Sequence, residues 1–368
     1  MTAHANQVAE TIRSRCANDY PTMFRNRVAV SASKVAFTVP QSDSWRDVTW
    51  AEVRDVVDRA AAGLLSLGLR YEQRVAIACA TRLEWIEADL AIASAGATTT
   101  TIYPATNVED MSHIITDSGA VMMVVENNEQ LTKVHQAPEL DDQVHAVIII
   151  DDDRPADAHT DERVIVWTEL LDRGAAYLLD HPTCVDDSID MLKPDSLSTL
   201  IYTSGTTGVP KGVEILHQSW AYEGAAIEHL NFIGEDDVNY LWLPLSHVFG
   251  RDLVAVQLQI GFRSIVDGRV DRIVDGLATT HPTVLVGVPR IFEKVRAAVM
   301  TMYPQNGLKG RISRWAFKVG RESRPYRLAE RPLPVALRVR YAIAEKLVFS
   351  KLKRKLGGRM RFMISGSA

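Results

Sequence analysis

The first half of the chain alternates short apolar runs with longer amphipathic stretches. The short runs are rich in valine, isoleucine, alanine or threonine, as buried strands usually are. Helical patterns over residues 81–94 and 108–116 lie between them, and another precedes residue 145. Strands separated by helices need crossover connections, so this order predicts a largely parallel, helix-flanked sheet. The expected strands are residues 75–80, 97–102, 121–125 and 145–150.

Two helix starts carry a specific signal. Thr49 is followed three residues later by Glu52, and Thr81 by Glu84, which is the spacing of a capping box. The first helix is expected to stop at Gly68, and the second to end shortly before Gly96.

The second half repeats the alternation after a break. Acidic residues and Lys193-Pro194 interrupt the pattern over 186–194. We therefore expect a first α/β subdomain over residues 1–192 and a second over 193–368. Its expected elements are strands at 200–203, 239–243, 264–266, 283–286 and 360–364, and helices at 219–229, 248–259 and within 290–355. The last strand is followed by only four residues, so the second subdomain is expected to be incomplete.

Composition narrows the class of protein. The chain has 368 residues, of which 46% are hydrophobic, which is enough for more than one core. Cys16, Cys79 and Cys184 lie far apart and are expected to be free thiols. The N-terminus lacks a signal-peptide pattern and the apolar runs are too short to span a bilayer. A cytoplasmic protein is expected.

Charge is unevenly distributed. The formal net charge is -5, which argues against a nucleic-acid partner. Residues 309–361 nevertheless hold 17 Lys and Arg against 3 acidic residues, a local net charge of +14. Such a segment forms either a surface that meets anions or a solvated helical face, and the sequence leaves both open.

The strongest local motif runs from Tyr202 to Gly212, YTSGTTGVPKG, after an expected strand. Gly205, Gly208 and Gly212 permit tight turns that bring backbone N–H groups close to an anion. Hydroxyls at Thr203, Ser204, Thr206 and Thr207, together with the charge of Lys211, add donors. At about 4 Å and an effective dielectric constant of about 20, such a charge attracts a phosphate oxygen by roughly 4 kcal/mol before desolvation.

Other loop types fit less well. A Walker A loop needs Gly-Lys-Ser/Thr, whereas Pro210 precedes Lys211 here, and no GxGxxG is present. A plain flexible linker would not need four hydroxyls and a lysine directly after an apolar strand.

This run resembles the phosphate-binding motif of the adenylate-forming (AMP-binding) superfamily. Residues 243–251, LPLSHVFGR, resemble its second core motif, and residues 288–295, VPRIFEKV, resemble the long-chain fatty acyl-CoA ligase subgroup. Residues 361–368, RFMISGSA, resemble the start of its adenine motif, and 48–53 its N-terminal region. The resemblance covers nearly the whole chain. It implies two largely parallel, helix-flanked sheets of the family's N-terminal domain, truncated before the β-barrel and C-terminal domain.

The resemblance also implies a reaction and site residues. A long-chain fatty acid would react with ATP to give acyl-AMP and then, with coenzyme A, acyl-CoA. Thr203, Ser204, Gly205, Thr206, Thr207, Gly208 and Lys211 would hold the phosphates, His247 would line the acyl side, and Gly366, Ser367 and Ala368 would begin the adenine wall. His247 and Lys211 are the candidate catalytic residues. No protein metal site is expected, and magnesium would arrive with ATP.

Parts of the family pattern would fall beyond residue 368. These are the magnesium-binding Glu, the ribose-binding Asp, the hinge and the C-terminal domain with its lysine. Little ligase activity is therefore expected from these residues by themselves. The alternatives are a catalytically dead remnant or the nucleotide-binding half of a split enzyme that needs a C-terminal complementing polypeptide.

Two further hypotheses come from other motifs. His247 and Asp252 have the HxxxxD spacing of glycerolipid acyltransferases, in which the carboxylate would orient the imidazole. This class leaves the glycine-threonine loop unexplained and is disfavoured. The basic residues around 351–355 suit contact with an anionic membrane or with the phosphates of coenzyme A, and membrane contact would be peripheral and salt-sensitive.

Overall fold

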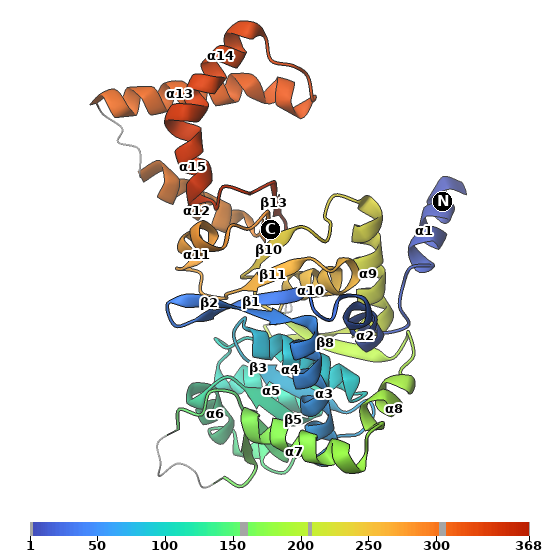
Figure 1. Ribbon diagram of the computed structural model, residues 1–368. Helices are drawn as coiled ribbons and strands as arrows, with labels where there is room; N and C mark the ends of the chain where they lie inside the picture. Colours follow the sequence, from blue (N-terminus) through green and yellow to red (C-terminus); the bar gives the residue numbers. More distant parts are fainter. Residues whose placement is uncertain (1–2, 155–160, 205–207, 302–306, 368) are drawn as a thin grey trace. The chain divides into compact units, whose positions relative to one another are not determined.

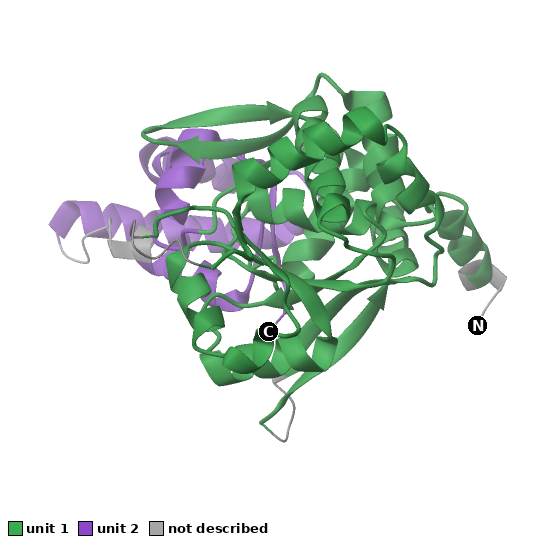
Figure 2. Cartoon of the chain, turned by 90° about the horizontal axis from the view of Figure 1, so that it is seen from below, with its two compact units in different colours: residues 1–236, 241–268 green, residues 237–240, 269–368 purple. Residues whose placement is uncertain are grey.

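Two compact units make up the computed structural model, which describes residues 3–154, 161–204, 208–301 and 307–367 (Figure 1). Unit 1 comprises residues 1–236 and 241–268, and unit 2 comprises residues 237–240 and 269–368 (Figure 2). The subdomain boundary expected at residues 192/193 stays a prediction.

Unit 1 contains a seven-stranded sheet in the order β7-β6-β5-β3-β4-β8-β9. Its neighbouring strands run parallel except β8 and β9, which form an antiparallel pair. The strands are β3 (Arg74–Ala78), β4 (Thr98–Ile102), β5 (Ala120–Val125), β6 (Ala146–Ile149), β7 (Val164–Val166), β8 (Leu197–Ser204) and β9 (Pro210–Leu216). The predicted parallel sheet is thus confirmed.

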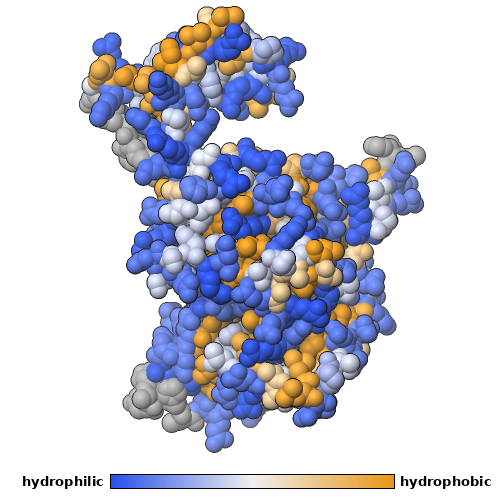
Figure 3. Space-filling view, viewed as in Figure 1, coloured by the Kyte–Doolittle hydropathy of each residue, from blue (hydrophilic) through white to orange (hydrophobic). Residues whose placement is uncertain are grey.

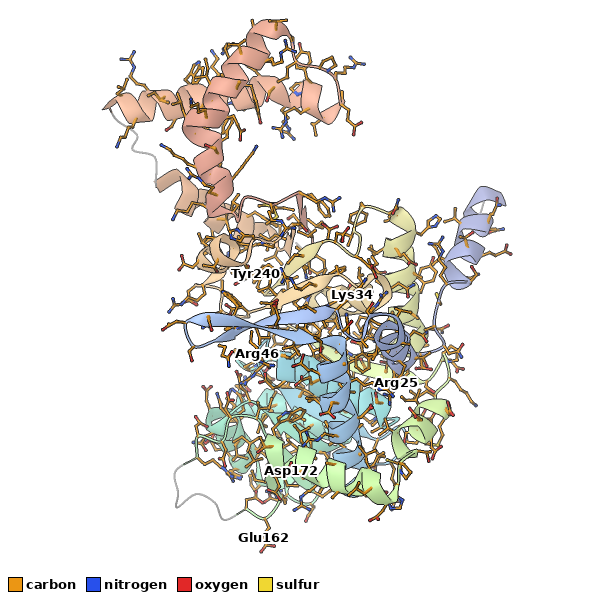
Figure 4. The ribbon with its side chains drawn as sticks, viewed as in Figure 1. Arg25, Lys34, Arg46, Glu162, Asp172 and Tyr240 are labelled. Carbon is orange, nitrogen blue, oxygen red and sulfur yellow. The ribbon has the colours of Figure 1, made fainter. Side chains whose placement is uncertain are left out.

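Helices pack on this sheet and on one another. One core cluster joins Met111, Ile114 and Ile115 of α5 to side chains of β3, β5, β6 and α6. On α3 and α7 the backbones approach closely, since a Cβ on Gly174 would lie 1.7 Å from the Arg59 carbonyl oxygen. Asp172 of α7, labelled in Figure 4, accepts a hydrogen bond from Arg59 of α3 at 3.1 Å. The helices are α3 (Trp50–Ser66), α4 (Leu83–Ser94), α5 (Val108–Ser118), α6 (Asn128–His135), the 3-10 turn η1 (Pro138–Leu140), α7 (Trp167–Asp180) and α8 (Cys184–Asp190).

The rest of unit 1 contains three strands in the order β11-β1-β2. Strand β1 is parallel to β11 and antiparallel to β2. These elements are α1 (Ala3–Arg13), α2 (Tyr20–Ser31), β1 (Val35–Gln41), β2 (Ser44–Thr49), α9 (His217–Leu230), α10 (Val248–Ile260) and β11 (Arg263–Val266). Cys16, Cys79 and Cys184 are free thiols, as expected.

Unit 2 holds the parallel strands β10, β12 and β13 and a series of helices. Tyr240 of β10, labelled in Figure 4, packs so closely on α11 that a Cβ on Gly276 would lie 2.1 Å from its hydroxyl oxygen. The elements are β10 (Val238–Leu241, whose residues 238–240 belong to unit 2), α11 (Ile273–Thr280), β12 (Val284–Gly287), α12 (Pro289–Thr301), α13 (Gly307–Leu328), α14 (Val335–Ala344), the π-helical turn η3 (Glu345–Phe349), α15 (Ser350–Lys355) and β13 (Phe362–Ser365).

One of the two predicted capping boxes is present. Thr49 and Glu52 bond reciprocally and start α3. At α4 the prediction was wrong, because Arg82 occupies the N-cap position and its side chain makes no capping bond. The Thr81 hydroxyl instead donates to the Leu243 carbonyl at 2.8 Å, and Glu84 pairs with Arg82 at 2.7 Å. The Thr81 hydroxyl bonds to this tertiary partner and therefore does not cap the helix.

Candidate active site

The predicted phosphate loop connects the two strands of a hairpin. Strand β8 ends at Ser204, β9 begins at Pro210, and Thr203 lies opposite Lys211 in the antiparallel register. Directly opposed residues share one face of a sheet, so the Thr203 hydroxyl and the Lys211 ammonium group lie on the same face. Both residues are exposed. Gly205, Thr206 and Thr207 lie outside the described residues.

Gly208 shows why glycine is needed at the end of this loop. Its φ is +84°, a left-handed conformation that a residue with a Cβ adopts only with strain. Nothing lies within 4 Å of a Cβ placed there, so the backbone conformation and not crowding requires glycine.

Helix α5 holds the base of the hairpin. The His113 Nε2 lies 3.1 Å from the Pro210 carbonyl oxygen, to which it donates in the matching tautomer. The Tyr202 hydroxyl donates to Asp117 at 2.6 Å, and burial together with this carboxylate raises the pKa of Tyr202. The strand ends beside the loop are therefore fixed from one side.

The second motif, residues 243–251, is attached to the same sheet. The Thr81 hydroxyl binds the Leu243 carbonyl, and the Thr101 hydroxyl donates to the Ser246 carbonyl at 3.0 Å. A Cβ on Gly250 would lie 2.3 Å from the Pro244 carbonyl oxygen, so only glycine fits this turn into α10.

His247 is the N-cap residue of α10. Its Nδ1 accepts the Phe249 backbone N–H at 3.2 Å, so the proton of a neutral ring lies on Nε2. The side chain is half-buried. Within the described part of the chain Nε2 has no hydrogen-bond partner, which leaves it available to a substrate.

Strand register brings His247 and the hairpin to the same edge of the sheet. Thr101 pairs with Ile201, two residues before Thr203, and the same Thr101 binds the residue preceding His247. Strands β4 and β8 are parallel and both end here, and the carboxyl ends of such strands are the usual ligand-binding edge of an α/β sheet.

A buried ion pair, which the sequence reasoning missed, fixes α10 beneath this edge. The Arg251 Nη2 lies 2.8 Å from each carboxylate oxygen of Asp89, and Thr99 also donates to Asp89 at 2.7 Å. Arg251 also binds Thr199 of β8, and its guanidinium carbon lies 4.7 Å from the ring centroid of Trp220. An arginine at helical spacing from the apolar residues Val254, Ala255 and Leu258 was the available signal. Arg251 is a positioning residue.

His247 and Asp252 do not form an acyltransferase dyad. No hydrogen bond joins them among the described residues, and the His247 Nδ1 is engaged by the Phe249 backbone N–H. Burial and the nearby Glu223 raise the pKa of Asp252 to about 7, against the opposing effect of Arg251.

The remaining predicted residues belong to unit 2. The Gly366 N–H donates to the Gly287 carbonyl at 3.1 Å, and Ser367 has a φ of +54°. Both follow β13, which runs parallel to β12. Ala368 lies outside the described residues. The roles inferred for these residues stay predictions.

These features define a class of protein. It is an α/β protein with a glycine- and hydroxyl-rich hairpin at the carboxyl edge of a parallel sheet. A family profile described as AMP-binding enzyme matches residues 24–368, so the chain belongs to that family. The resemblance and the fold class inferred from the sequence are both confirmed.

The curated relatives are longer than this chain. It is 33% identical over 331 residues to the long-chain-fatty-acid–CoA ligase FadD15 of Mycobacterium bovis, covering 88% of this chain and 52% of that protein. It is 27% identical to the long-chain-fatty-acid–CoA ligase ACSBG2 of Homo sapiens, covering 95% and 52%. The chain therefore spans about half the length of these curated relatives.

Solved structures share the fold at low identity. The adenylation domain of a carboxylate reductase from Mycobacterium chelonae matches with a TM-score of 0.65 and 18% identity, covering 99% of this chain and 56% of that one. A long-chain-fatty-acid-CoA ligase from Archaeoglobus fulgidus matches with a TM-score of 0.64 and 18% identity, covering 78% and 55%. Identities this low bear on the fold alone.

Proposed function

We propose that this chain supplies the nucleotide-binding part of a ligase that activates a long-chain fatty acid, first as acyl-AMP and then as acyl-CoA. The observation that carries the proposal is the hairpin of β8 and β9, with Lys211 opposite Thr203 at the carboxyl edge of a parallel sheet. Membership of the AMP-binding enzyme family and the names of the relatives support it.

The hairpin fits a triphosphate. Lys211 is exposed and lies opposite Thr203 in the strand register, and Gly208 has a left-handed backbone conformation between them. Backbone N–H groups in such turns, hydroxyls and an ammonium group are the donors that phosphate oxygens need. Magnesium would come bound to ATP and would neutralise part of the phosphate charge.

The residues of the site would then have distinct tasks. Lys211 and Thr203 would hold the phosphate oxygens and offset charge that develops on the departing pyrophosphate. His247 would line the acyl side, with its Nε2–H free to donate to a carboxylate oxygen. Gly366, Ser367 and Ala368 would begin the wall beside the adenine. Coenzyme A would be the acceptor in the second step.

The direct test is nucleotide binding by a Lys211→Ala variant. Loss of one positively charged phosphate contact should weaken ATP binding by about tenfold. Lys211→Arg should retain part of the affinity, because the charge is kept. The readout is the dissociation constant from titration calorimetry, together with ATP–pyrophosphate exchange when the chain is completed by the other half of such a ligase.

Lys193→Ala is the matched control. Lys193 is an exposed lysine that precedes β8 and lies outside the hairpin. Equal ATP affinity in the Lys211→Ala and wild-type chains would contradict the proposed phosphate site.

We also propose a cytoplasmic protein that contacts anionic membranes peripherally. In the described part of the chain no helix combines the length and apolar character needed to cross a bilayer. The local net charge of +14 over residues 309–361 supports an interaction with anionic lipid. A fatty substrate partitions into membranes, so such contact would bring the enzyme to its substrate.

A further inference from the structure

Helix α14 has apolar residues on two sides. On its inner side Leu337, Tyr341 and Ala344 pack against α13, where Ala316 and Val319 are fully buried. Arg327 of α13 also stacks over the Tyr341 ring, with its guanidinium carbon 5.5 Å from the centroid. This inner side accounts for the packing of α13 and α14 on each other.

The other side of α14 exposes a second set of large apolar side chains. Val335, Val339 and Ile343 of α14 and Leu347 of the following turn η3 are spaced four residues apart, and their exposed fractions are 68%, 54%, 47% and 44%. We call these four residues the outer stripe. Figure 3 shows apolar side chains gathered over this helix, at the top of the view. A helix that is apolar on both sides normally has both sides covered.

Basic residues surround the outer stripe. Residues 335–355 hold seven Lys and Arg and one acidic residue, Glu345. Lys353 neutralises Glu345 at 2.8 Å, and Arg340 pairs with Glu322 of α13 at 3.0 Å. The charge beside the stripe is thus strongly positive. Lysine and arginine stems can extend along an apolar surface and present their charges at a membrane interface.

A pocket among the same group of helices also suits an anionic amphiphile. It has a volume of about 740 Å³ and lies within unit 2. Apolar side chains such as Phe317 and Leu352 line it together with several guanidinium groups. Four of these guanidinium groups belong to α13, at Arg314, Arg321, Arg324 and Arg327. Apolar walls with cationic groups fit a chain that carries an anionic head.

We propose that the outer stripe of α14 is the surface by which this protein docks on an anionic lipid bilayer. Val335, Val339, Ile343 and Leu347 enter the headgroup region, while Arg338, Lys346, Lys351 and Lys355 contact lipid phosphates. An apolar helical face flanked by basic residues is the pattern of interfacial helices, and charge complementarity selects anionic lipid. This inference rests on the peripheral contact proposed above and names its surface.

Vesicle cosedimentation tests the surface. The wild-type chain should bind vesicles of phosphatidylcholine mixed with phosphatidylglycerol, bind pure phosphatidylcholine vesicles far less, and dissociate as salt increases. The double variant Val339→Ser, Ile343→Ser should bind the mixed vesicles at least about tenfold more weakly than the wild type. Both side chains are exposed, so the fold should be retained, which circular dichroism checks.

Matched controls lie in unit 1. Val30 and Leu179 are exposed by 72% and 84%, more than Val339 and Ile343, so Val30→Ser, Leu179→Ser removes apolar groups that are at least as exposed and should leave vesicle binding unchanged. A second variant tests the contribution of charge. Arg338→Gln, Lys346→Gln should weaken binding to the anionic vesicles by about tenfold. Arg70→Gln, Lys193→Gln, which alters exposed basic residues of unit 1, should not.

The outcomes separate the two proposals. If the wild type binds anionic vesicles and the stripe variant binds them equally well, the proposed docking surface is wrong, while the proposed membrane contact is retained. Absence of wild-type binding to anionic vesicles overturns both. A lipid-free dimer that the stripe variant dissociates would make the stripe a protein interface and would also overturn the inference. ATP binding, measured on the same variants, should not change and reports separately on the ligase proposal.

Discussion

His217, the first residue of α9, is buried near Arg251, whose ion pair with Asp89 anchors α10. Its Nδ1 accepts the Tyr20 backbone N–H at 3.2 Å, and its Nε2 has no hydrogen-bond partner among the described residues. Burial and, to a smaller extent, the charge of Arg251 lower the pKa of His217 to about 4. The folded protein therefore holds a neutral imidazole here at physiological pH.

This histidine should make stability fall in acid. Its pKa is lower in the folded chain than the ordinary 6.5, so the unfolded chain binds the proton first. The stabilisation is complete above about pH 7 and is lost as the pH falls toward 4. Between pH 7 and pH 5 linkage predicts a loss of about 2 kcal/mol. Urea unfolding measures this effect. The free energy of unfolding of His217→Asn should depend less steeply on pH than that of the wild type over the same range.

Other groups titrate over the same range, so the comparison needs a control. Asp252 and Glu87 have pKa values raised to about 7 and about 8, chiefly by burial, and they favour the folded state at low pH. His145→Asn, at an exposed position, keeps both carboxyl groups and should retain the wild-type slope. If the His145 and His217 variants showed the same pH dependence, the buried histidine would not be its source.

At the scale of elements, the two Thr-x-x-Glu motifs show how tertiary contacts decide local structure. Thr49 caps α3 through its hydroxyl and receives the reciprocal bond from Glu52. Thr81 has the same sequence context but is buried, and its hydroxyl binds the Leu243 carbonyl at 2.8 Å. One motif starts a helix, and the other ties the segment before His247 to the sheet.

The same substitution should have very different consequences for stability at the two positions. Aspartate is as good an N-cap as threonine, so Thr49→Asp should change the free energy of unfolding by no more than about 0.5 kcal/mol. Thr81→Asp would bury a carboxylate facing a carbonyl oxygen and should cost several kcal/mol. Chemical denaturation measures both. Equal effects would mean that the two threonines have the same role.

The sequence predicted elements that carry a strong hydrophobic pattern and missed those without one. Strands β3, β4, β5 and β6 are almost fully buried and were expected from their apolar runs. Strand β9 is largely exposed and contains proline and glycine, so nothing in its pattern indicated that Lys211 lies on a strand. The hairpin depends on pairing with β8, which is a long-range contact that local periodicity does not contain.

The candidate site shows the same division. The residue types of the hairpin and of the segment around His247 were identifiable from the sequence. Their common location was not, because it depends on Thr101 pairing with Ile201 while its hydroxyl reaches Ser246. The ion pair of Arg251 and Asp89 joins residues 162 positions apart, and neither residue type indicates its partner.

At the scale of the whole molecule, the chain spans about half the length of its curated relatives. The hairpin that would hold the phosphates is present, whereas the ribose- and magnesium-binding segments of the family pattern would lie in the other half. Binding and turnover should therefore separate. Under the proposed function, nucleotide affinity would depend on the contacts available here, whereas the transition state would need groups from both halves held in one geometry.

Joining the two halves is the corresponding experiment. The 368 residues by themselves should bind ATP measurably and show almost no fatty-acid-dependent ATP–pyrophosphate exchange. Coexpression with a polypeptide supplying the remaining half of such a ligase should raise exchange by several orders of magnitude, since positioned catalytic groups act together and not additively. The same pair carrying Lys211→Ala should lose most of that gain, which ties the restored activity to this hairpin. Rapid exchange by the 368 residues without the second polypeptide would contradict the division of labour, because every group needed for adenylation would then have to lie within them.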